Sequence, residues 1–251
     1  MSAAVHANNL RKKLGIEFPP FSPQKAFEKL GVVYKEQPLD GCLGMTIRIP
    51  GSDLAGVIVS SEIAEQGRIN FTAAHELGHL TIPSHATDTF KCTESSLDLF
   101  NTRANNKEVE ANQFAAEWLL PRAVFREKSK SNEPGFDLIH SLSATFNTSI
   151  TATALRLVDL SDHRLMLVVS NNGQIKYFKK SEDFPYFLSM GTTPKSYVRE
   201  VANGKLEQED YLSTDSDLWF NGRQPESQEV YEWSLKLGDY PTVLTLLWVD
   251  D

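Results

Sequence analysis

Phe71-Thr-Ala-Ala-His75-Glu76-Leu-Gly-His79 is the most informative stretch of this chain, because it contains a His-Glu-x-x-His motif. In a helix, side chains four residues apart lie on one face, so His75 and His79 can direct imidazole nitrogens at a single metal ion. Glu76 then stands beside the ion, where it can accept a proton from a water molecule. Zinc is the expected metal, with one ion per chain, because imidazole and carboxylate ligands suit it. A motif this short also arises by chance, so other parts of the chain must support it.

A catalytic zinc usually has three protein ligands and a water, so a third ligand is needed. His85 lies where metzincin peptidases carry a third histidine, in the pattern H-E-x-x-H-x-x-G-x-x-H. Ile82 stands where those enzymes have glycine, and a β-branched residue is unfavourable wherever φ must be positive. Pro83 can also end the helix, but the favoured interpretation of His85 is an exposed histidine in a loop.

Glu108 is the better candidate for the third ligand. The segment from Glu108 to Pro121 predicts a helix with small residues at Ala111 and Ala115, a face that allows close approach to the helix of the motif. Glu108 lies one turn before Ala111 on this face. Glu110 is rotated from it by about 200° and is therefore the weaker candidate.

Two blocks of sequence together carry a resemblance to a known family. They are Arg68-x-x-Phe-Thr-x-Ala-His-Glu-Leu-Gly-His79 and Glu108-x-x-Ala-Asn-x-Phe-Ala-Ala-x-x-Leu-x-Pro121. Over roughly residues 15–160 the chain resembles the ImmA/IrrE family of bacterial metallopeptidases. The resemblance implies that His75, His79 and Glu108 bind zinc and that Glu76 is the catalytic glutamate. The chain departs from the family pattern in lacking the methionine often found before the proline.

The resemblance also implies a function. Members of the family cut helix-turn-helix transcriptional repressors and so derepress stress-response or mobile-element genes. The chain is therefore expected to be a zinc-dependent endopeptidase that cleaves a specific intracellular protein. The alternative is a non-catalytic, zinc-stabilised protein that captures a repressor or another partner without cleavage. The presence of Glu76 argues against this alternative, because a scaffold does not need that residue.

The chain as a whole predicts an α+β protein in three parts. Residues 1–133 are expected to form a mainly helical zincin-like core with a small antiparallel sheet, whose strands lie near residues 32–34, 45–49 and 55–60. Residues 134–160 predict a helix-turn-helix-like pair of helices. Residues 84–106 are poor in periodic apolar positions and predict a loop.

Residues 161–251 predict a smaller α+β module with at least four strands. An Asn-Gly turn at residues 171–173 and a turn at 238–241 each indicate a hairpin. In the family, such a region is often a GAF-like sensory domain. Asp215 and Asp217 are expected to be solvated, because the pattern of an EF-hand calcium loop is absent. The pair Trp219-Phe220 indicates either a binding surface or part of the core.

Charge and composition narrow the partners and the compartment. The net charge is −8, and Arg156 is the sole lysine or arginine between positions 136 and 160, so direct binding to nucleic acid is not expected. No apolar run approaches the roughly 18 residues of a membrane span. Residues 1–14 lack the apolar region of a secretory signal, which indicates a cytoplasmic protein. Cys42 and Cys92 are then expected to be reduced.

Four further side chains have a structural and a functional interpretation. Asn112 is expected either to orient a zinc ligand or to bond between helices. His140 is expected to lie on a helix surface rather than to stabilise the oxyanion of the reaction. Tyr34 is expected in the core, and Glu117 is expected to be solvated.

Overall fold

The computed structural model describes residues 2–49, 52, 54–85, 89–93, 105–130, 132–208, 210–220, 229–238 and 240–250. The chain divides into two compact units: Met1–Val124 with Ser143–Ser149, and Phe125–Leu142 with Ile150–Asp251. Most of the loop expected over residues 84–106, and part of the turn expected at 238–241, lie outside the described residues. The three-part division of the sequence stays a prediction.

The first unit contains a four-stranded sheet with the strand order β1-β3-β2-β4. The strands are β1 (Val33–Gln37), β2 (Gly44–Arg48), β3 (Ala55–Ser60) and β4 (Phe90–Cys92). β2 runs antiparallel to β3 and to β4, as expected, but β1 runs parallel to β3. The expectation of a wholly antiparallel sheet was therefore wrong. β3 lies between β1 and β2 in the sheet, and it runs in the same direction as β1.

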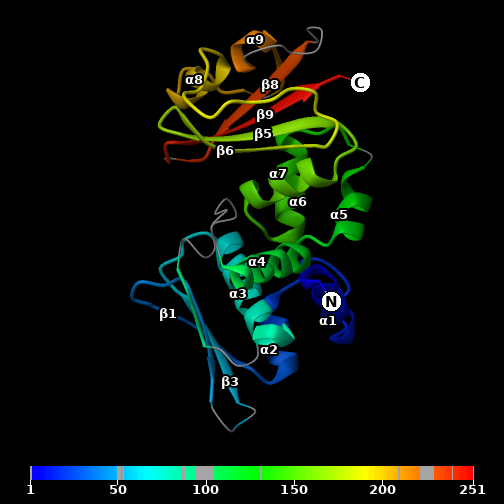
Figure 1. The fold of residues 1–251 in the computed structure, drawn as a ribbon, viewed down its shortest axis with the longest axis vertical. Coiled ribbons are helices and arrows are strands. Elements are labelled where there is room, and N and C mark those ends of the chain that lie inside the picture. Colours follow the sequence, from blue (N-terminus) through cyan, green and yellow to red (C-terminus); the bar gives the residue numbers. More distant parts are fainter. Residues whose placement is uncertain are drawn as a thin grey trace. The chain divides into compact units, whose positions relative to one another are not determined.

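The helices of the first unit pack beside this sheet (Figure 1). They are α1 (Ala3–Lys13), α2 (Pro23–Leu30), α3 (Gln66–Thr81), the short 3-10 helix η1 (Pro83–His85) and α4 (Asn106–Leu119). Helix α2 has the expected serine cap, since Ser22 accepts a hydrogen bond from the amide of Lys25, and it ends at Gly31 with φ +68°. α1 was not predicted, although its buried residues Ala3, Ala7 and Leu10 have helical spacing.

Close contact between α3 and α4 depends on small residues, as the sequence predicted. Ala111 and Ala115 of α4 are fully buried. A Cβ atom at Gly78 of α3 would lie 3.3 Å from the Cα atom of Ala111. These small residues therefore let the two helices approach each other closely along the turn that contains the motif.

The second unit contains a five-stranded antiparallel sheet with the order β6-β5-β9-β8-β7. Its strands are β5 (Arg164–Asn171), β6 (Gln174–Lys180), β7 (Leu212–Thr214), β8 (Val230–Lys236) and β9 (Thr242–Val249). Both predicted hairpins are confirmed. Asn172 and Gly173 have φ +49° and +68°, the left-handed pair that a tight hairpin turn requires.

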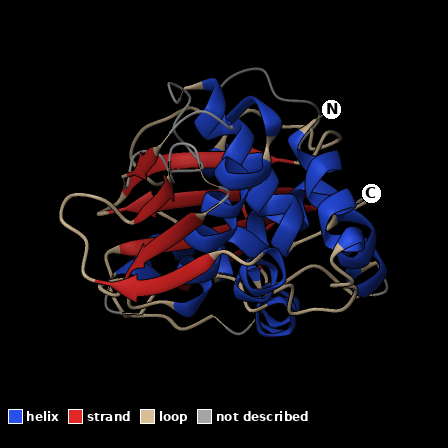
Figure 2. Cartoon of the chain, turned by 90° about the horizontal axis from the view of Figure 1, so that it is seen from below, coloured by secondary structure: helices blue, strands red, loops and turns tan. Residues whose placement is uncertain are grey.

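Helices cover both faces of this second sheet. The remaining helices are α5 (Arg122–Ser129), α6 (Phe136–Phe146), α7 (Ile150–Leu160), α8 (Tyr197–Ala202) and α9 (Ser216–Trp219). Figure 1 shows α8 and α9 on one side of the sheet and α7 on the other. Each unit thus combines helices and strands, and the α+β class is confirmed. Figure 2 colours the helices and strands of the chain.

Glu232 on β8 holds α8 and α9 against the sheet. Its Oε1 accepts a hydrogen bond of 2.6 Å from the amide of Val198, and its Oε2 accepts one of 2.7 Å from Nε1 of Trp219. Burial raises the pKa of this carboxyl, and the hydrogen bond from Trp219 opposes that rise. Trp219 is therefore part of the core, and Asp215 caps α9 by accepting from the amide of Asp217.

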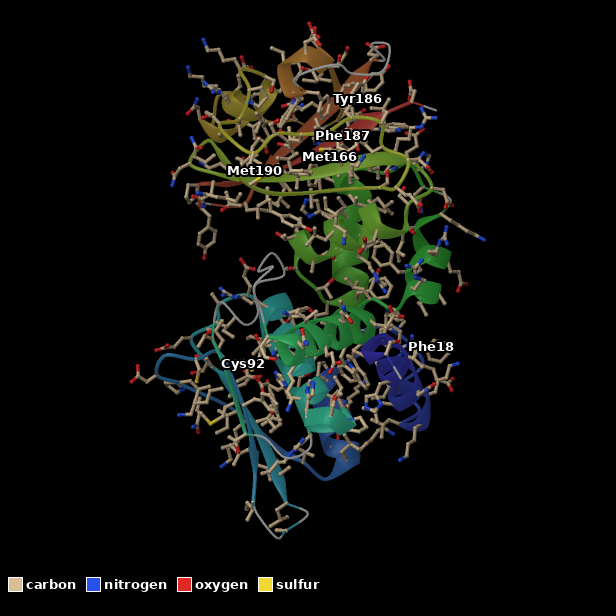
Figure 3. The ribbon with its side chains drawn as sticks, in the orientation of Figure 1. Phe18, Cys92, Met166, Tyr186, Phe187 and Met190 are labelled. Atoms are coloured by element: carbon tan, nitrogen blue, oxygen red, sulfur yellow. The ribbon has the colours of Figure 1, made fainter. Side chains whose placement is uncertain are left out.

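Cys42 and Cys92 are both buried and both free thiols. Figure 3 places Cys92 among the strands of the first unit. None of the helices within the described ranges combines the length and the apolar character that crossing a bilayer requires.

Candidate metal centre

His75 and His79 lie one turn apart on α3, and both are fully buried. Their Nε2 atoms are 2.9 Å apart. Glu108, from the first turn of α4, places its Oε2 atom 3.1 Å from Nε2 of His75 and 3.5 Å from Nε2 of His79. Ligand atoms around a tetrahedral zinc would be separated by about 3.3 Å, given bonds of about 2.0–2.2 Å. The structure thus brings the three predicted ligands together at a suitable spacing.

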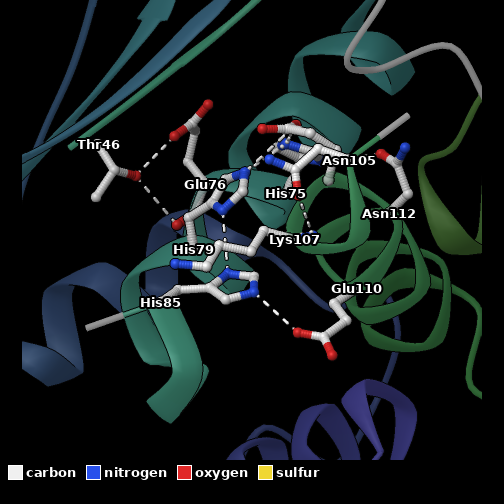
Figure 4. A network of polar contacts seen from close by, with 10 residues as sticks. Thr46, His75, Glu76, His79, His85, Asn105, Lys107, Glu110 and Asn112 are labelled. Carbon is white, nitrogen blue, oxygen red and sulfur yellow. Dashed lines mark hydrogen bonds and ion pairs between the residues drawn. The ribbon is translucent and has the colours of Figure 1, made fainter. Parts of the chain in front are cut away.

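Asn112 fixes the orientation of His75. Its Oδ1 atom lies 2.8 Å from Nδ1 of His75 (Figure 4). An amide oxygen can only accept, so Nδ1 carries the proton and the lone pair of Nε2 faces Glu108 and His79. Such a partner on the remote nitrogen is typical of metal-binding histidines. Of the two roles expected for Asn112, the structure shows the contact with a candidate ligand.

A second chain of contacts runs behind His79. Its Nδ1 atom is 3.1 Å from Nδ1 of His85, and Nε2 of His85 is 3.0 Å from Oε2 of Glu110 (Figure 4). If Nε2 of His79 carries the lone pair, its Nδ1–H donates to His85, and Nε2–H of His85 donates to Glu110. His85 and Glu110 thus lie behind the cluster and hold one of its members in place.

The expectation that His85 is an exposed loop residue was wrong. His85 is fully buried at the end of η1. Ile82 leaves α3 with φ −69° and ψ +123°, an extended conformation that a β-branched residue adopts readily. The chain therefore turns back without the glycine of the metzincin pattern, and His85 reaches the rear of His79.

Glu76 is fully buried and only partly hydrogen-bonded. Its Oε2 accepts a hydrogen bond of 2.6 Å from Oγ1 of Thr46 on β2. Its Oε1 has no hydrogen-bond partner among the described residues. Gly44 leaves room for this carboxylate, because a Cβ atom there would collide with it. A buried oxygen without a partner is costly and therefore indicates a group that binds or reacts.

The surroundings set the protonation of these groups. Burial raises the pKa of Glu76, against the opposing effects of His75, Thr46 and the Cys92 thiol. Burial also lowers the pKa of His79 to about 4, although Glu108 opposes this. Burial alone would raise the pKa of Glu108, but the contacts with His75 and His79 outweigh it and lower the value to about 2. At neutral pH a neutral imidazole and an ionised carboxylate face each other, as metal binding requires.

Cys92 also lies at this cluster, although the sequence did not indicate it. Ligand atoms of His75, His79, Cys92 and Glu108 all lie within 4.8 Å of one another. Burial raises the pKa of the Cys92 thiol, and the carboxylates of Glu76 and Glu108 add to this rise. Cys92 is separate from the two motifs in sequence, and it comes close through the pairing of β4 with β2, where it lies opposite Gly44.

Comparison with known proteins identifies the family of the chain. The family described as Peptidase_M78, the IrrE N-terminal-like domain, matches residues 28–158, which is more than half of the 251 residues. The chain belongs to this family. The resemblance to ImmA/IrrE proteins is thereby confirmed, and the family is one of metallopeptidases.

A solved structure gives a second comparison for the fold. A Mycobacterium tuberculosis transcriptional regulator is similar, with a TM-score of 0.60 and 12% sequence identity, over 98% of this chain and 76% of the other. At this identity the likeness concerns the fold alone. No curated protein matches the chain.

Three other candidates do not belong to the cluster at the metal centre of this IrrE-type protein. Glu117 was expected to be solvated, but it is buried. Its Oε1 accepts a hydrogen bond of 2.8 Å from Asn8 of helix α1, which was not predicted. His140 is exposed on α6, as expected. Tyr34 is half-buried on β1, where it stacks on Phe27 and donates its hydroxyl proton to Glu36.

Proposed function

We propose that the chain is a zinc-dependent endopeptidase in which His75, His79 and Glu108 hold the metal and Glu76 is the general base. One observation carries this proposal. The Nε2 atoms of His75 and His79 and the Oε2 atom of Glu108 lie 2.9–3.5 Å from one another. The turn of α3 that carries the two histidines also carries Glu76, whose buried Oε1 has no hydrogen-bond partner among the described residues. The donor set of two imidazoles and one carboxylate is one that zinc peptidases use, and it leaves a fourth position for water.

The residues of the chain then have separate roles in hydrolysis. When bound, zinc would lower the pKa of a water molecule toward neutrality and polarise the carbonyl of the peptide. Oε1 of Glu76 accepts the proton of the attacking water and passes it to the leaving amine. Thr46 holds the other oxygen of Glu76 in place. Burial, by raising the pKa of Glu76, increases its affinity for that proton.

The substrate is proposed to be a helix-turn-helix repressor, whose cleavage derepresses stress-response or mobile-element genes. Membership in the IrrE-type family supports this. Among the described strands, β4 forms an edge of the sheet and ends at Cys92 beside the cluster. An edge strand in this place offers main-chain hydrogen bonds to an extended peptide. The acidic net charge of −8 favours a protein partner over nucleic acid, and a cytoplasmic location stays a prediction.

The test compares new protein amino termini in cells that express the wild type, Glu76→Gln or Glu232→Gln. The last variant alters a buried glutamate of the other unit and is the matched control. The proposal predicts one or a few termini, inside a helix-turn-helix protein, in the wild type and the control but not in Glu76→Gln. Equal sets of termini in wild type and Glu76→Gln, in cells that contain zinc-loaded protein, would refute it.

Cys92 supports a second candidate function. If its sulfur joined the two histidines and Glu108, the zinc would have four protein ligands, and a site closed in this way is structural rather than catalytic. The protein would then capture a repressor or another partner without cleaving it. The buried Oε1 of Glu76, which has no hydrogen-bond partner among the described residues, favours the open site, because a structural site has no use for a free base there.

A further inference from the structure

A pocket in the second unit has a lining that the peptidase function does not use. Its volume is about 510 Å³, within the range of small-molecule sites. Four aromatic side chains contribute to its walls: Tyr211, Tyr231, Trp233 and Trp248. All the lining residues belong to the second unit, so the pocket is independent of the metal centre.

The register of the sheet explains why these rings meet. Tyr231 on β8 lies opposite Trp248 on β9, and Trp233 follows two residues later on the same face of the sheet. Glu232, between them, points to the other face, where it binds α8 and α9. Tyr211 directly precedes β7, whose residues pair with β8.

The rings form walls in different planes rather than a stack. The Tyr211 ring is 5.5 Å from that of Trp233, at 75°, and 5.4 Å from that of Trp248, at 61°. Tyr231 lies 6.2 Å from Trp248, at 50°. Rings that line one pocket at steep angles to each other can present more than one π face to a bound organic cation.

The remaining polar lining is acidic. Glu133, Asp137, Asp210 and Asp250 line the pocket, and none of its lining residues is a lysine or arginine. The amino terminus of α6 also lies here, and its dipole corresponds to roughly half a positive charge. Arg164, which is not a lining residue, donates a hydrogen bond to the main-chain oxygen of Asp250. Four carboxylates exceed the positive charge of Arg164 and of the helix dipole together, so the pocket attracts cations.

Two further contacts indicate a preformed site. A Cβ atom at Gly135 would lie 2.6 Å from the Trp233 ring, and Phe136 packs edge-on against the same ring at 5.6 Å, so this wall is fixed. The hydroxyl of Tyr211 is buried without a hydrogen-bond partner among the described residues. A polar group in that state is typical of a site that a ligand or ordered water completes.

We propose that this pocket binds a small organic cation with a weakly hydrated charge, that is, a quaternary ammonium or guanidinium group. The aromatic walls provide cation–π attraction, and the carboxylates provide the long-range field. A hard metal ion is a poorer occupant, because it requires a shell of oxygen ligands that aromatic walls do not supply.

The first test is calorimetric titration of the full chain with choline, as a quaternary ammonium probe, and with agmatine, as a guanidinium probe. Each is compared with an uncharged isostere in which carbon replaces the cationic centre. We expect saturable binding of at least one cation in the millimolar range or tighter, with the isostere about tenfold weaker. Absence of binding by both cations, or equal binding of the isosteres, would overturn the proposal.

Variants locate the binding in this pocket. Trp248→Leu and Tyr231→Leu each remove one π face and should weaken cation binding by about tenfold. Phe187→Leu is the matched control, because Phe187 (labelled in Figure 3) belongs to the same unit, is 72% exposed and does not line the pocket. Melting curves establish which variants fold. Wild-type affinity in a folded Tyr231→Leu or Trp248→Leu protein would contradict the assignment, and zinc content should not change in any of them.

Discussion

Glu76 on α3 and Glu232 on β8 are both fully buried glutamates, one in each unit, and burial raises the pKa of both. They differ in their partners. Glu232 has a hydrogen-bond donor on each carboxylate oxygen, whereas Oε1 of Glu76 has none among the described residues. A buried carboxylate that is satisfied by the fold holds elements together. One that is left unsatisfied, beside converging nitrogens, is available for chemistry.

The largest expected effect is on turnover, and it separates the two glutamates. Glu76→Gln should lower peptide hydrolysis by about a hundred- to ten-thousand-fold, since it removes the general base, while zinc stays bound. Glu232→Gln should leave hydrolysis within about twofold of the wild type, because it lies in a different unit and touches no site residue. Kinetics on zinc-loaded proteins measure both. Comparable losses in the two variants would remove the distinction.

Loss of a ligand should have the next largest effect, on zinc affinity. His75→Ala or Glu108→Ala should weaken zinc binding by more than about a hundredfold. Loss of a residue that only supports a ligand lowers metal affinity by at most about a hundredfold, and loss of a ligand itself should cost more. His140→Ala replaces an exposed histidine and is the matched control. Competition with a chelator measures the affinity. If Glu108→Ala bound zinc with wild-type affinity, the third ligand would be another side chain, and Cys92 would be the first candidate.

Residues behind the ligands should have a smaller effect. Asn112→Leu and His85→Phe each remove a partner of a histidine Nδ1 atom, and should lower zinc affinity by about ten- to a hundredfold. Glu110→Gln keeps an oxygen that can accept a hydrogen bond from His85. Its zinc affinity should therefore fall less than the zinc affinity of Glu110→Leu. Cobalt absorption spectra report ligand geometry separately from activity. Unchanged affinity and spectra in His85→Phe would show that His85 only fills space.

The smallest effect is on stability against pH, and it belongs to Glu232. Its pKa in the folded state is raised above the ordinary 4.5. The native state therefore holds this proton more tightly than the unfolded chain, and that contribution to stability is lost as pH rises through the raised pKa. The melting temperature of the wild type, minus that of Glu232→Gln, should decline as pH increases above this ordinary value. A difference that is constant with pH would contradict the assignment.

How much of the site the sequence predicted depends on whether a residue lies on a regular element. His75, His79 and Glu108 were predicted to lie together because of helix geometry and the small residues Ala111 and Ala115, which let two helix faces approach closely. The hairpin turn at Gly173 was predicted because its dihedral angles restrict the residue types.

The residues that were missed depend on long-range contacts. Cys92 reaches the cluster only through a strand of three residues, too short to show a period of two. Glu117 was taken as solvated because α1, which covers it, was not predicted. His85 was misplaced because η1 turns the chain back without a glycine. The strand at Cys92 and the turn at His85 have no local sequence pattern strong enough to predict them, whereas the spacing of Ala3, Ala7 and Leu10 does indicate α1.

The most direct test of the account is X-ray absorption at the zinc edge of the wild-type protein, compared with Cys92→Ser. The account predicts one zinc per chain with nitrogen and oxygen ligands alone, at about 2.0–2.2 Å, and identical spectra for the two proteins. This result would establish an open site in which Glu76 can act as a base. A sulfur ligand at about 2.3 Å that disappears in Cys92→Ser would show a closed, structural site and contradict the proposed peptidase.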